Sequence, residues 1–346
     1  MDFSIHNILR IKLLGKNASY VKYLTKVFHY FITNEKIENP DLVIDISEPR
    51  LDKDNYHIFN RKYWIKENYI YWKDRYKVVL WTASLKGIEE SSTYLQFNSG
   101  RFGKILLLDL LIEPLINFKL IQKGFMLLHA SGLSINNKGF IFPAYMGVGK
   151  TSTLLNLIEK GDFLANEKVI LSSDGFIYGN PLPVDVYYYN IKVSPGFSKK
   201  ININEYIELW LKYLIYKISL GYATFPLEID PRCLWRIKDK CPLKSLFILT
   251  KTNREKIRII EDCEKEEIIR RLIIITKFDM RYFNEILEAY NFFYETSLIT
   301  NFWERIREIL SKALKSATCY IIEIPYNYDF TTINSIYKLI QSNLEN

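Results

Sequence analysis

The chain has 346 residues, of which 48% are hydrophobic and 15% aromatic, and its formal net charge is +8 at pH 7. This composition excludes a disordered chain, because it supplies enough apolar surface to bury a large core. The length predicts two domains, or one large domain with an appendage.

The sequence favours a cytoplasmic protein. Its four cysteines and four histidines lack the spacing of a metal site, which fits a reduced compartment. Residues 1–6 lack the basic-then-apolar design of a signal peptide. The most apolar segment, residues 105–121, carries Asp109, Glu113 and Lys119. We therefore expect a buried helix there and no membrane partner.

Basic residues are most concentrated between residues 232 and 271, where 12 basic residues accompany 7 acidic ones. A basic surface can bind the phosphates of nucleic acid, which leaves an RNA-directed activity open. Solvated surface charge explains the same excess more simply, so nucleic acid is not expected as the main partner. Assembly into a homo-oligomer also stays open.

Residues 1–100 are expected to form a smaller α+β module. A helix is predicted over residues 18–32, because apolar residues recur there on one helical face. Short aromatic-rich runs separated by turn residues predict an antiparallel sheet. The expected strands are residues 40–46, 56–59, 64–66, 69–72 and 77–81.

Residues 101–346 are expected to form the second domain, after the turn-forming residues 98–100. Its expected strands are residues 126–130, 139–142, 168–171, 176–179, 246–250 and 320–324. Its expected helices are residues 105–123, a helix ending at residue 161, residues 205–220, a helical region over 262–314, and residues 331–344.

Residues 144–151, AYMGVGKT, carry the clearest chemical signal. They follow the apolar run 139–142 and precede an apolar helical segment, which gives a strand, a glycine loop and a helix. Glycines let backbone N–H groups turn towards phosphate, and the helix N-terminus adds a favourable dipole. Lys150 would reach the β- and γ-phosphates of a nucleoside triphosphate, and the Thr151 hydroxyl would bind Mg²⁺.

The loop departs from the full phosphate-loop pattern only at Ala144, where the first glycine is expected. The alternative is a tight turn that is rich in glycine by chance, and the Lys-Thr pair at the correct positions argues against it. The residues expected to contact the nucleotide are Met146, Gly147, Val148, Gly149, Lys150, Thr151 and Ser152.

Residues 129–187 resemble the catalytic domain of the HPr kinase/phosphorylase family of P-loop proteins. The resemblance rests on a strand with His129, the glycine loop, a helix ending Glu-Lys-Gly, and a polar pair before an apolar strand. These segments are residues 128–132, 146–151, 159–161 and 165–169. It extends loosely over the rest of the second domain and does not include the N-terminal module.

The resemblance implies an α/β fold like that of phosphoenolpyruvate carboxykinase, with a mixed sheet and helices. It also implies a kinase that uses ATP and Mg²⁺ and transfers the γ-phosphoryl group to a serine-like hydroxyl; GTP in place of ATP stays open. The family's histidine contacts the reacting phosphate region. The expected catalytic residues are therefore His129, Glu167 and Lys150, and the expected metal ligands are Thr151 and Glu167.

The chain departs from the family at Asn166-Glu167, where two aspartates are usual. An amide cannot take a proton from an attacking hydroxyl in this pH range. Glu167 can act as base or bind Mg²⁺, but a carboxylate displaced by about 1 Å can lower a rate on the order of 10²-fold. The alternative function is therefore a catalytically weak nucleotide-binding accessory or regulatory protein.

Two further residues have both a functional and an ordinary interpretation. Asp185 would add a carboxylate near the metal, or cap a loop. Arg232 would neutralise phosphate charge, or be a surface arginine, which is the simpler interpretation. The acceptor is open among a peptide, a protein and a small hydroxyl compound.

Overall fold

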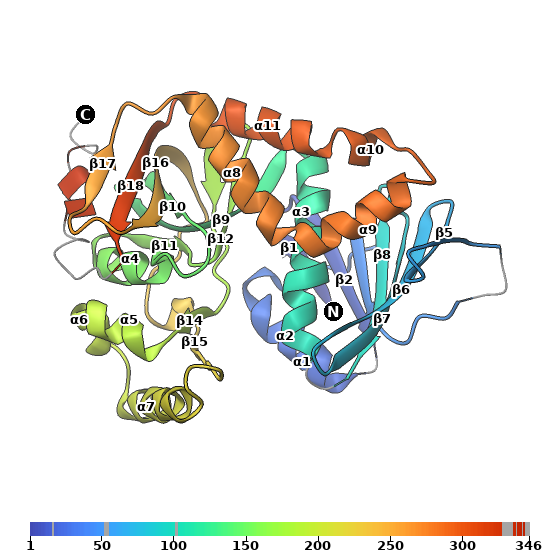
Figure 1. The fold of residues 1–346 in the computed structure, drawn as a ribbon, viewed down its shortest axis with the longest axis horizontal. Coiled ribbons are helices and arrows are strands. Elements are labelled where there is room, and N and C mark those ends of the chain that lie inside the picture. Colours follow the sequence, from blue (N-terminus) through green and yellow to red (C-terminus); the bar gives the residue numbers. More distant parts are fainter. Residues whose placement is uncertain are drawn as a thin grey trace. The chain divides into compact units, whose positions relative to one another are not determined.

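The computed structural model describes residues 1–15, 17–51, 55–100, 103–326, 335–336, 338–340 and 342. The chain is a mixed α/β protein with two large mixed sheets and interspersed helices (Figure 1). It divides into two compact units. The first comprises Met1–Met126 and Thr276–Ile309, and the second comprises Leu127–Ile275 and Leu310–Asn346.

The first unit is built on an eight-stranded sheet. Its strands are β1 (Asp2–Ile5), β2 (Leu9–Gly15), β3 (Leu42–Ile46), β4 (His57–Phe59), β5 (Tyr63–Lys66), β6 (Tyr69–Tyr76), β7 (Val79–Lys86) and β8 (Thr93–Ser99). Their order is β1-β2-β3-β8-β7-β6-β5-β4. β3 is parallel to both β2 and β8, and the other neighbours are antiparallel.

Helices from two distant parts of the chain belong to the first unit. They are α1 (Ala18–Val27), η1 (His29–Phe31), α2 (Gly103–Leu107), η2 (Leu108–Ile112), α3 (Glu113–Gln122), α9 (Arg281–Asn291) and α10 (Ser297–Thr300). Two more helices, α8 (Lys265–Asp279) and α11 (Phe302–Ala313), include the positions at which the chain passes from one unit to the other.

The antiparallel meander that the sequence predicted is confirmed as β4 to β7, and the helix predicted over residues 18–32 as α1 followed by η1. The sequence missed β1, β2 and β8, so it also missed the parallel pairing that makes the sheet mixed. The apolar segment 105–121 is a largely buried helical segment, as predicted. It even buries Lys119, whose Nζ donates to the Glu90 carbonyl at 3.0 Å.

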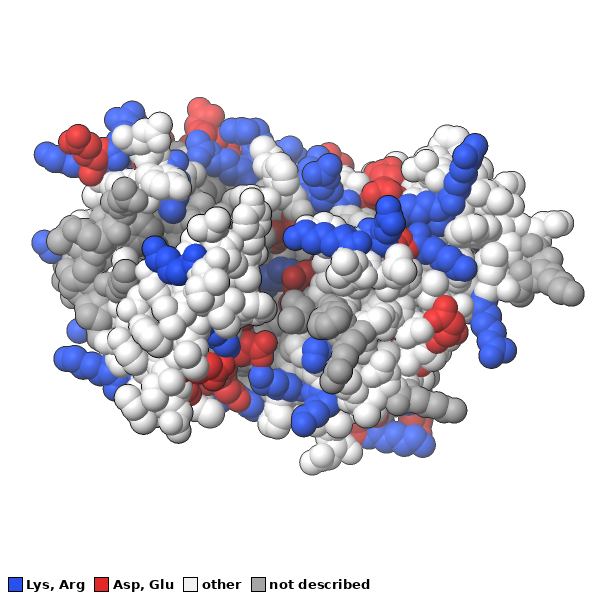
Figure 2. All heavy atoms as spheres, turned by 60° about the horizontal axis from the view of Figure 1, so that its bottom comes forward, with Lys and Arg blue, Asp and Glu red and all other residues white. Residues whose placement is uncertain are grey.

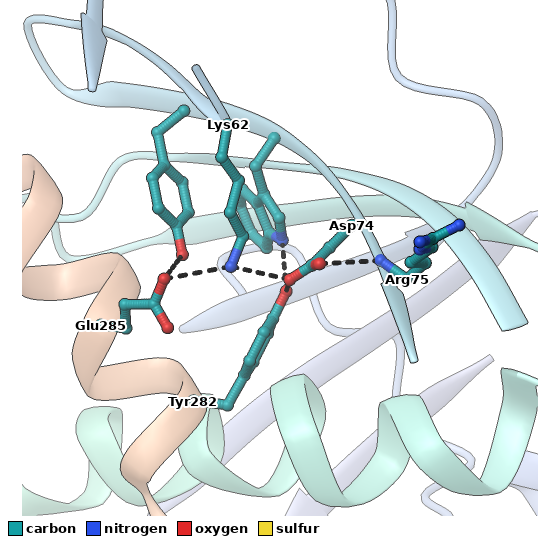
Figure 3. Close-up of polar contacts among 7 residues, drawn as sticks. Lys62, Asp74, Arg75, Tyr282 and Glu285 are labelled. Atoms are coloured by element: carbon teal, nitrogen blue, oxygen red, sulfur yellow. Dashed lines mark hydrogen bonds and ion pairs between the residues drawn. The ribbon is translucent and has the colours of Figure 1, made fainter. Parts of the chain in front are cut away.

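A polar cluster attaches α9 to the sheet of the first unit (Figure 3). The Tyr63 hydroxyl donates to Glu285 Oε1 at 2.6 Å, and Lys62 Nζ lies 3.1 Å from the same oxygen. Lys62 Nζ also lies 2.7 Å from Asp74 Oδ2, to which the Tyr282 hydroxyl donates at 2.8 Å. Burial is the largest of the causes that raise the pKa values of both tyrosines, so both hydroxyls stay protonated donors.

These contacts explain why the units interleave along the chain. The sequence predicted domains of 1–100 and 101–346, whereas residues 103–126 and 276–309 lie in the first unit with the N-terminal sheet. The partners of α9 lie on strands more than a hundred residues earlier in the chain; they include Tyr63 on β5 and Asp74 on β6. Local sequence patterns carry no sign of such a distant partner.

Removing the Tyr282 hydroxyl is expected to destabilise the first unit. The hydroxyl accepts from Trp72 Nε1 at 3.1 Å while it donates to Asp74, so Tyr282→Phe leaves a donor and part of a carboxylate unpaired. We expect the free energy of unfolding to fall by about 1–3 kcal/mol in urea titrations. Tyr76→Phe, at a residue that is 54% exposed, is the control. Equal stability of the two variants would contradict a stabilising role for this cluster.

The second unit is built on the other large sheet. Its strands are β9 (Phe125–Ile135), β10 (Lys138–Pro143), β11 (Asp162–Ala165), β12 (Lys168–Ser172), β13 (Phe176–Tyr178), β16 (Lys240–Thr252), β17 (Arg258–Ile260) and β18 (Thr318–Pro325). The order is β10-β9-β12-β13-β16-β18-β17, with β11 on β9 and a further pairing of β10 with β16. β10 and β18 are both parallel to β16.

Helices and a two-stranded sheet complete the second unit. The helices are α4 (Lys150–Leu157), η3 (Ile158–Lys160), α5 (Tyr188–Val193), α6 (Pro195–Ser198), α7 (Ile203–Ile218) and η4 (Pro231–Cys233). The small sheet pairs β14 (Val184–Val186) with β15 (Leu227–Ile229). Phe142, Phe247 and Tyr320 stack across β10, β16 and β18, with centroids 5.4 and 5.1 Å apart.

All six strands predicted for the second domain are confirmed, and so is α7. The sequence missed the short strands β11, β14, β15 and β17. The predicted helix over residues 331–344 lies mostly outside the described residues. Within the part of the chain that the structure describes, no helix combines the length and apolar character needed to cross a membrane.

Candidate functional site

The glycine loop leaves the carboxyl end of β10, beside the parallel strand β16, and enters α4 at Lys150. Gly147 and Gly149 have φ angles of +75° and +118°, a region that strains residues with a side chain. A Cβ on Gly147 would meet nothing within 4 Å, so the backbone conformation alone requires glycine there. Ligands commonly bind at the carboxyl ends of parallel strands.

Lys150 turns its amine back onto the loop. Its Nζ donates to the carbonyls of Ala144 at 3.2 Å and Tyr145 at 3.5 Å, and only 5% of the residue is exposed. The first backbone N–H groups of α4 lie beyond the reach of intrahelical bonds. The loop therefore combines an ammonium group with a helix N-terminus, which is the chemistry that grips a polyphosphate.

Ala144 fits the place where the phosphate-loop pattern has glycine. It is fully buried, and its N–H donates to the His129 carbonyl at 3.4 Å. This backbone hydrogen bond requires no conformation that is restricted to glycine. The pairing also ties the start of the loop to β9, the strand that carries His129.

His129 and Glu167 lie together although 38 residues separate them in the chain. His129 Nε2 is 3.4 Å from Glu167 Oε2. The link is made by adjacent strands, because the Ala130 N–H donates to the Glu167 carbonyl at 3.0 Å next to β12. His129 is buried, whereas 49% of the Glu167 side chain is exposed and within reach of a ligand.

Glu167 is held in its ionised form. Desolvation is the largest single influence and raises its pKa, but the hydrogen bond with His129 and the charge of Lys150 act together against it. The net effect is a pKa below the ordinary value of 4.5. The Ser131 hydroxyl, two residues after His129 on β9, donates to the Lys150 carbonyl at 3.4 Å, so Lys150 lies beside the strand that carries His129.

Asn166 supports the same carboxylate from inside the protein. It is 2% exposed, and its Nδ2 donates to Glu167 Oε1 at 3.2 Å. Its amide oxygen Oδ1 is buried without a hydrogen-bond partner among the described residues. An amide oxygen of this kind can accept a donor from a ligand or serve as an oxygen ligand for a hard cation.

The other predicted nucleotide contacts differ in their surroundings. Met146 is 74% exposed, Val148 packs against the core of the unit, and Thr151 is half-buried at the start of α4. Ser152 is buried, and its Oγ accepts from Asn190 Nδ2 at 2.9 Å. The Ser152 side chain therefore joins α4 to α5, which leaves only its backbone N–H for a phosphate.

Sequence reasoning missed Tyr187, which follows β14. Its pKa is raised to about 12, first by burial and then by the charges of Asp185, Tyr189 and Glu167. The Tyr187 N–H donates to Asn190 Oδ1 at 2.8 Å, and Asn190 Nδ2 donates to Ser152 Oγ at 2.9 Å, so Tyr187 is tied to the start of α4. A single tyrosine in a chain with 25 of them gives no signal that could have found it.

Arg232 has a local partner rather than a place in this site. Its Nε donates to Asp230 Oδ1 at 2.8 Å, which agrees with the simpler interpretation of a surface arginine.

A metal would need ligands beyond the protein's own side chains. Among the described residues, no group of three or more His, Cys, Asp or Glu side chains could hold a metal ion. Mg²⁺ bound with a nucleotide needs few protein ligands, because phosphates and waters supply the rest. Thr151 and Glu167, with the Asn166 amide oxygen, are the oxygen donors that suit such an ion.

No similarity to a known protein adds to what the geometry of the site shows. No protein-family model matches the chain, and no curated protein sequence is significantly similar to it.

The basic segment 232–271 contains six arginines and six lysines. Its six arginines each have an acidic partner. Among them, Arg236 Nε lies 2.5 Å from Asp162 and Arg271 Nη2 lies 2.7 Å from Glu267. Figure 2 shows basic and acidic side chains interspersed over the visible face. Paired charges attract a nucleic-acid backbone less than free ones, so the arginines of this segment give little support to an RNA-directed activity.

Replacing Asn166 with aspartate is expected to destabilise the site at neutral pH. Asn166→Asp sets a buried carboxylate beside the half-exposed carboxylate of Glu167 and removes the N–H donor, which raises the pKa of the pair. An acid whose pKa is higher in the folded state than in the unfolded state lowers the free energy of unfolding as the pH rises. We expect a loss of about 2–4 kcal/mol at pH 7.5 that shrinks towards pH 5 and on addition of Mg²⁺.

Urea unfolding at the two pH values, with and without Mg²⁺, measures this effect. Asn137→Asp is the control, because Asn137 is an exposed turn residue with φ of +62°, where aspartate is tolerated. A loss of stability that is the same at both pH values would contradict the expected repulsion.

Proposed function

We propose that the chain is a kinase that binds Mg²⁺-ATP at residues 144–151 and transfers the γ-phosphoryl group to a hydroxyl acceptor. We propose with it that the second unit has a fold like that of HPr kinase and phosphoenolpyruvate carboxykinase. One observation supports the proposal most. A positive-φ glycine loop with a buried lysine leaves a parallel strand beside a His–Glu pair.

The residues have separate roles in this proposal. The loop amides and Lys150 hold the β- and γ-phosphates and neutralise their charge. Thr151 and the ionised Glu167 bind the metal, and Glu167 also accepts a hydrogen bond from the acceptor hydroxyl. His129 keeps the Glu167 carboxylate in position. Phosphoryl transfer needs positioning and charge neutralisation more than covalent work, which suits a carboxylate of low basicity.

Asn166 supports a second candidate function. The amide cannot act as a base, so nucleotide binding could persist with little transfer. In that case the chain is a nucleotide-binding accessory or regulatory protein.

Two measurements separate the candidates. Calorimetry with Mg²⁺-ATP and Mg²⁺-GTP tests nucleotide binding, and mass spectrometry of cell extract after incubation with isotopically marked ATP tests transfer. A kinase binds nucleotide and marks an acceptor. Binding without a marked acceptor supports the accessory protein, and the absence of binding removes both.

A further inference from the structure

Helix α7 is attached to the second unit by one side only. Leu209 is its single fully buried residue. The Tyr213 ring stacks on Tyr188 of α5 with centroids 4.3 Å apart, and Lys212 Nζ donates to the Pro226 carbonyl at 2.7 Å. Figure 1 shows α7 beyond α5 and α6, with its other side facing away from them.

The outward side of α7 is apolar along its whole length. Ile207, Leu211, Leu214 and Ile218 follow one another at intervals of four, three and four residues, so they form one stripe. Ile207 and Leu211 are each 49% exposed and Ile218 is 82% exposed. The loop after the helix extends the patch with Tyr222, which is 93% exposed.

This patch is large enough to be a contact surface. At about 150–250 Å² for a large apolar side chain, the exposed parts of Ile207, Leu211, Ile218 and Tyr222 amount to roughly 500 Å². The largest apolar patch on a typical monomer is about 300–600 Å², and a patch of this size is often functional. If an equal patch on a partner covers it, the two faces together bury about 1,000 Å², the lower limit for a specific interface.

We infer that α7 is the dimer interface of this protein and that its outward side packs, antiparallel, on α7 of a second copy. The apolar residues of the stripe follow one another at intervals of four, three and four whether α7 is read from its N-terminus or from its C-terminus. An antiparallel copy therefore sets Ile207 opposite Ile218 of the second copy and Leu211 opposite its Leu214. Such a self-complementary stripe is what a two-fold contact between identical chains requires. Intervals of three and four are also those of two helices packed side by side.

The flanks of the stripe agree with a second copy better than with other occupants. In this register Lys217 lies near Trp210 of the second copy, which permits a cation–π contact. An anionic lipid surface is not favoured, because Glu205 and Glu208 balance Lys212 and Lys217 and leave α7 no excess of basic residues. The dimer is independent of the proposed kinase activity, because α7 contributes no residue to the glycine loop.

Sedimentation of the full-length chain tests the dimer. We expect the wild type to be dimeric at micromolar concentration and Leu211→Lys to weaken association at least about 100-fold, since it sets a charge at the centre of the apolar contact. Val78→Lys is the matched control, because Val78 is an apolar residue, 87% exposed, in the first unit. It should sediment as wild type. Both variants should bind Mg²⁺-ATP as the wild type does.

Cross-linking tests which faces meet. Leu211→Cys combined with Leu214→Cys, in a Cys233→Ser background that removes an exposed thiol, should form an interchain link through a short bis-maleimide. Val78→Cys in that background should not. A wild type that stays monomeric at 100 µM would overturn the inference. So would a dimer unaffected by Leu211→Lys, or a monomer that binds anionic vesicles through α7.

Discussion

Replacing Lys150 with methionine is expected to reduce phosphoryl transfer by about 10³-fold or more and to weaken nucleotide binding markedly. Lys150 is buried with its amine on the loop carbonyls of Ala144 and Tyr145, so it is already directed into the loop. Methionine keeps the aliphatic stem in its place and removes only the charge and the donors. The effect then reports the lost contact with phosphate rather than a cavity.

Calorimetry and steady-state rates with Mg²⁺-ATP measure this loss. Lys160→Met is the control, because Lys160 is exposed just after α4. The proposal fails if Lys150→Met folds normally and keeps wild-type affinity for both ATP and GTP. A thermal unfolding curve of the variant shows whether the fold is kept.

Replacing Glu167 with glutamine is expected to lower kcat by about 10²–10⁴-fold, the range for loss of a group that acts directly on a transferring proton or metal. Glutamine keeps the shape of the side chain and removes its charge. The pairing with His129 at 3.4 Å and the attraction of Lys150 are lost with that charge. Binding of metal-free nucleotide should change little, while the Mg²⁺ concentration needed for half-maximal rate should rise.

A titration of the initial rate with Mg²⁺ at saturating ATP measures both effects. Glu159→Gln is the control, since Glu159 is an exposed glutamate that pairs with Lys200 at 2.8 Å. The comparison with Lys150→Met is decisive for the two candidate functions. If Lys150→Met abolishes binding but Glu167→Gln changes nothing, the chain is an accessory protein that binds nucleotide without using Glu167.

The sequence predicted the glycine loop well because its elements are local. A strand, two glycines and a helix follow one another within residues 139–157, and each has its own signal in the residues. The pairing of His129 with Glu167 is of another kind. It depends on β9 and β12 being neighbours, so it could be expected only from the family resemblance and not from spacing.

The missed elements have physical reasons. β2 alternates buried Leu9, Ile11 and Leu13 with more exposed residues, which is a readable strand pattern that was overlooked. It pairs antiparallel with β1 just before it, and only its parallel partner β3 is distant in the chain. β11, β14, β15 and β17 have three or four residues each, too few for periodicity to show. The attachment of α9 depends on Tyr63 and Asp74, which lie more than 200 residues away from it.

The interleaving of the two units has a consequence for the order of folding. The N-terminal sheet is synthesised first, yet α9, which pairs with Tyr63 and Asp74, emerges from the ribosome only after most of the second unit. Until then the nascent sheet presents the partners of α9 to solvent, among them Trp72, which is fully buried in the finished protein. Co-translational folding of the first half therefore stays incomplete until the chain has grown past residue 291.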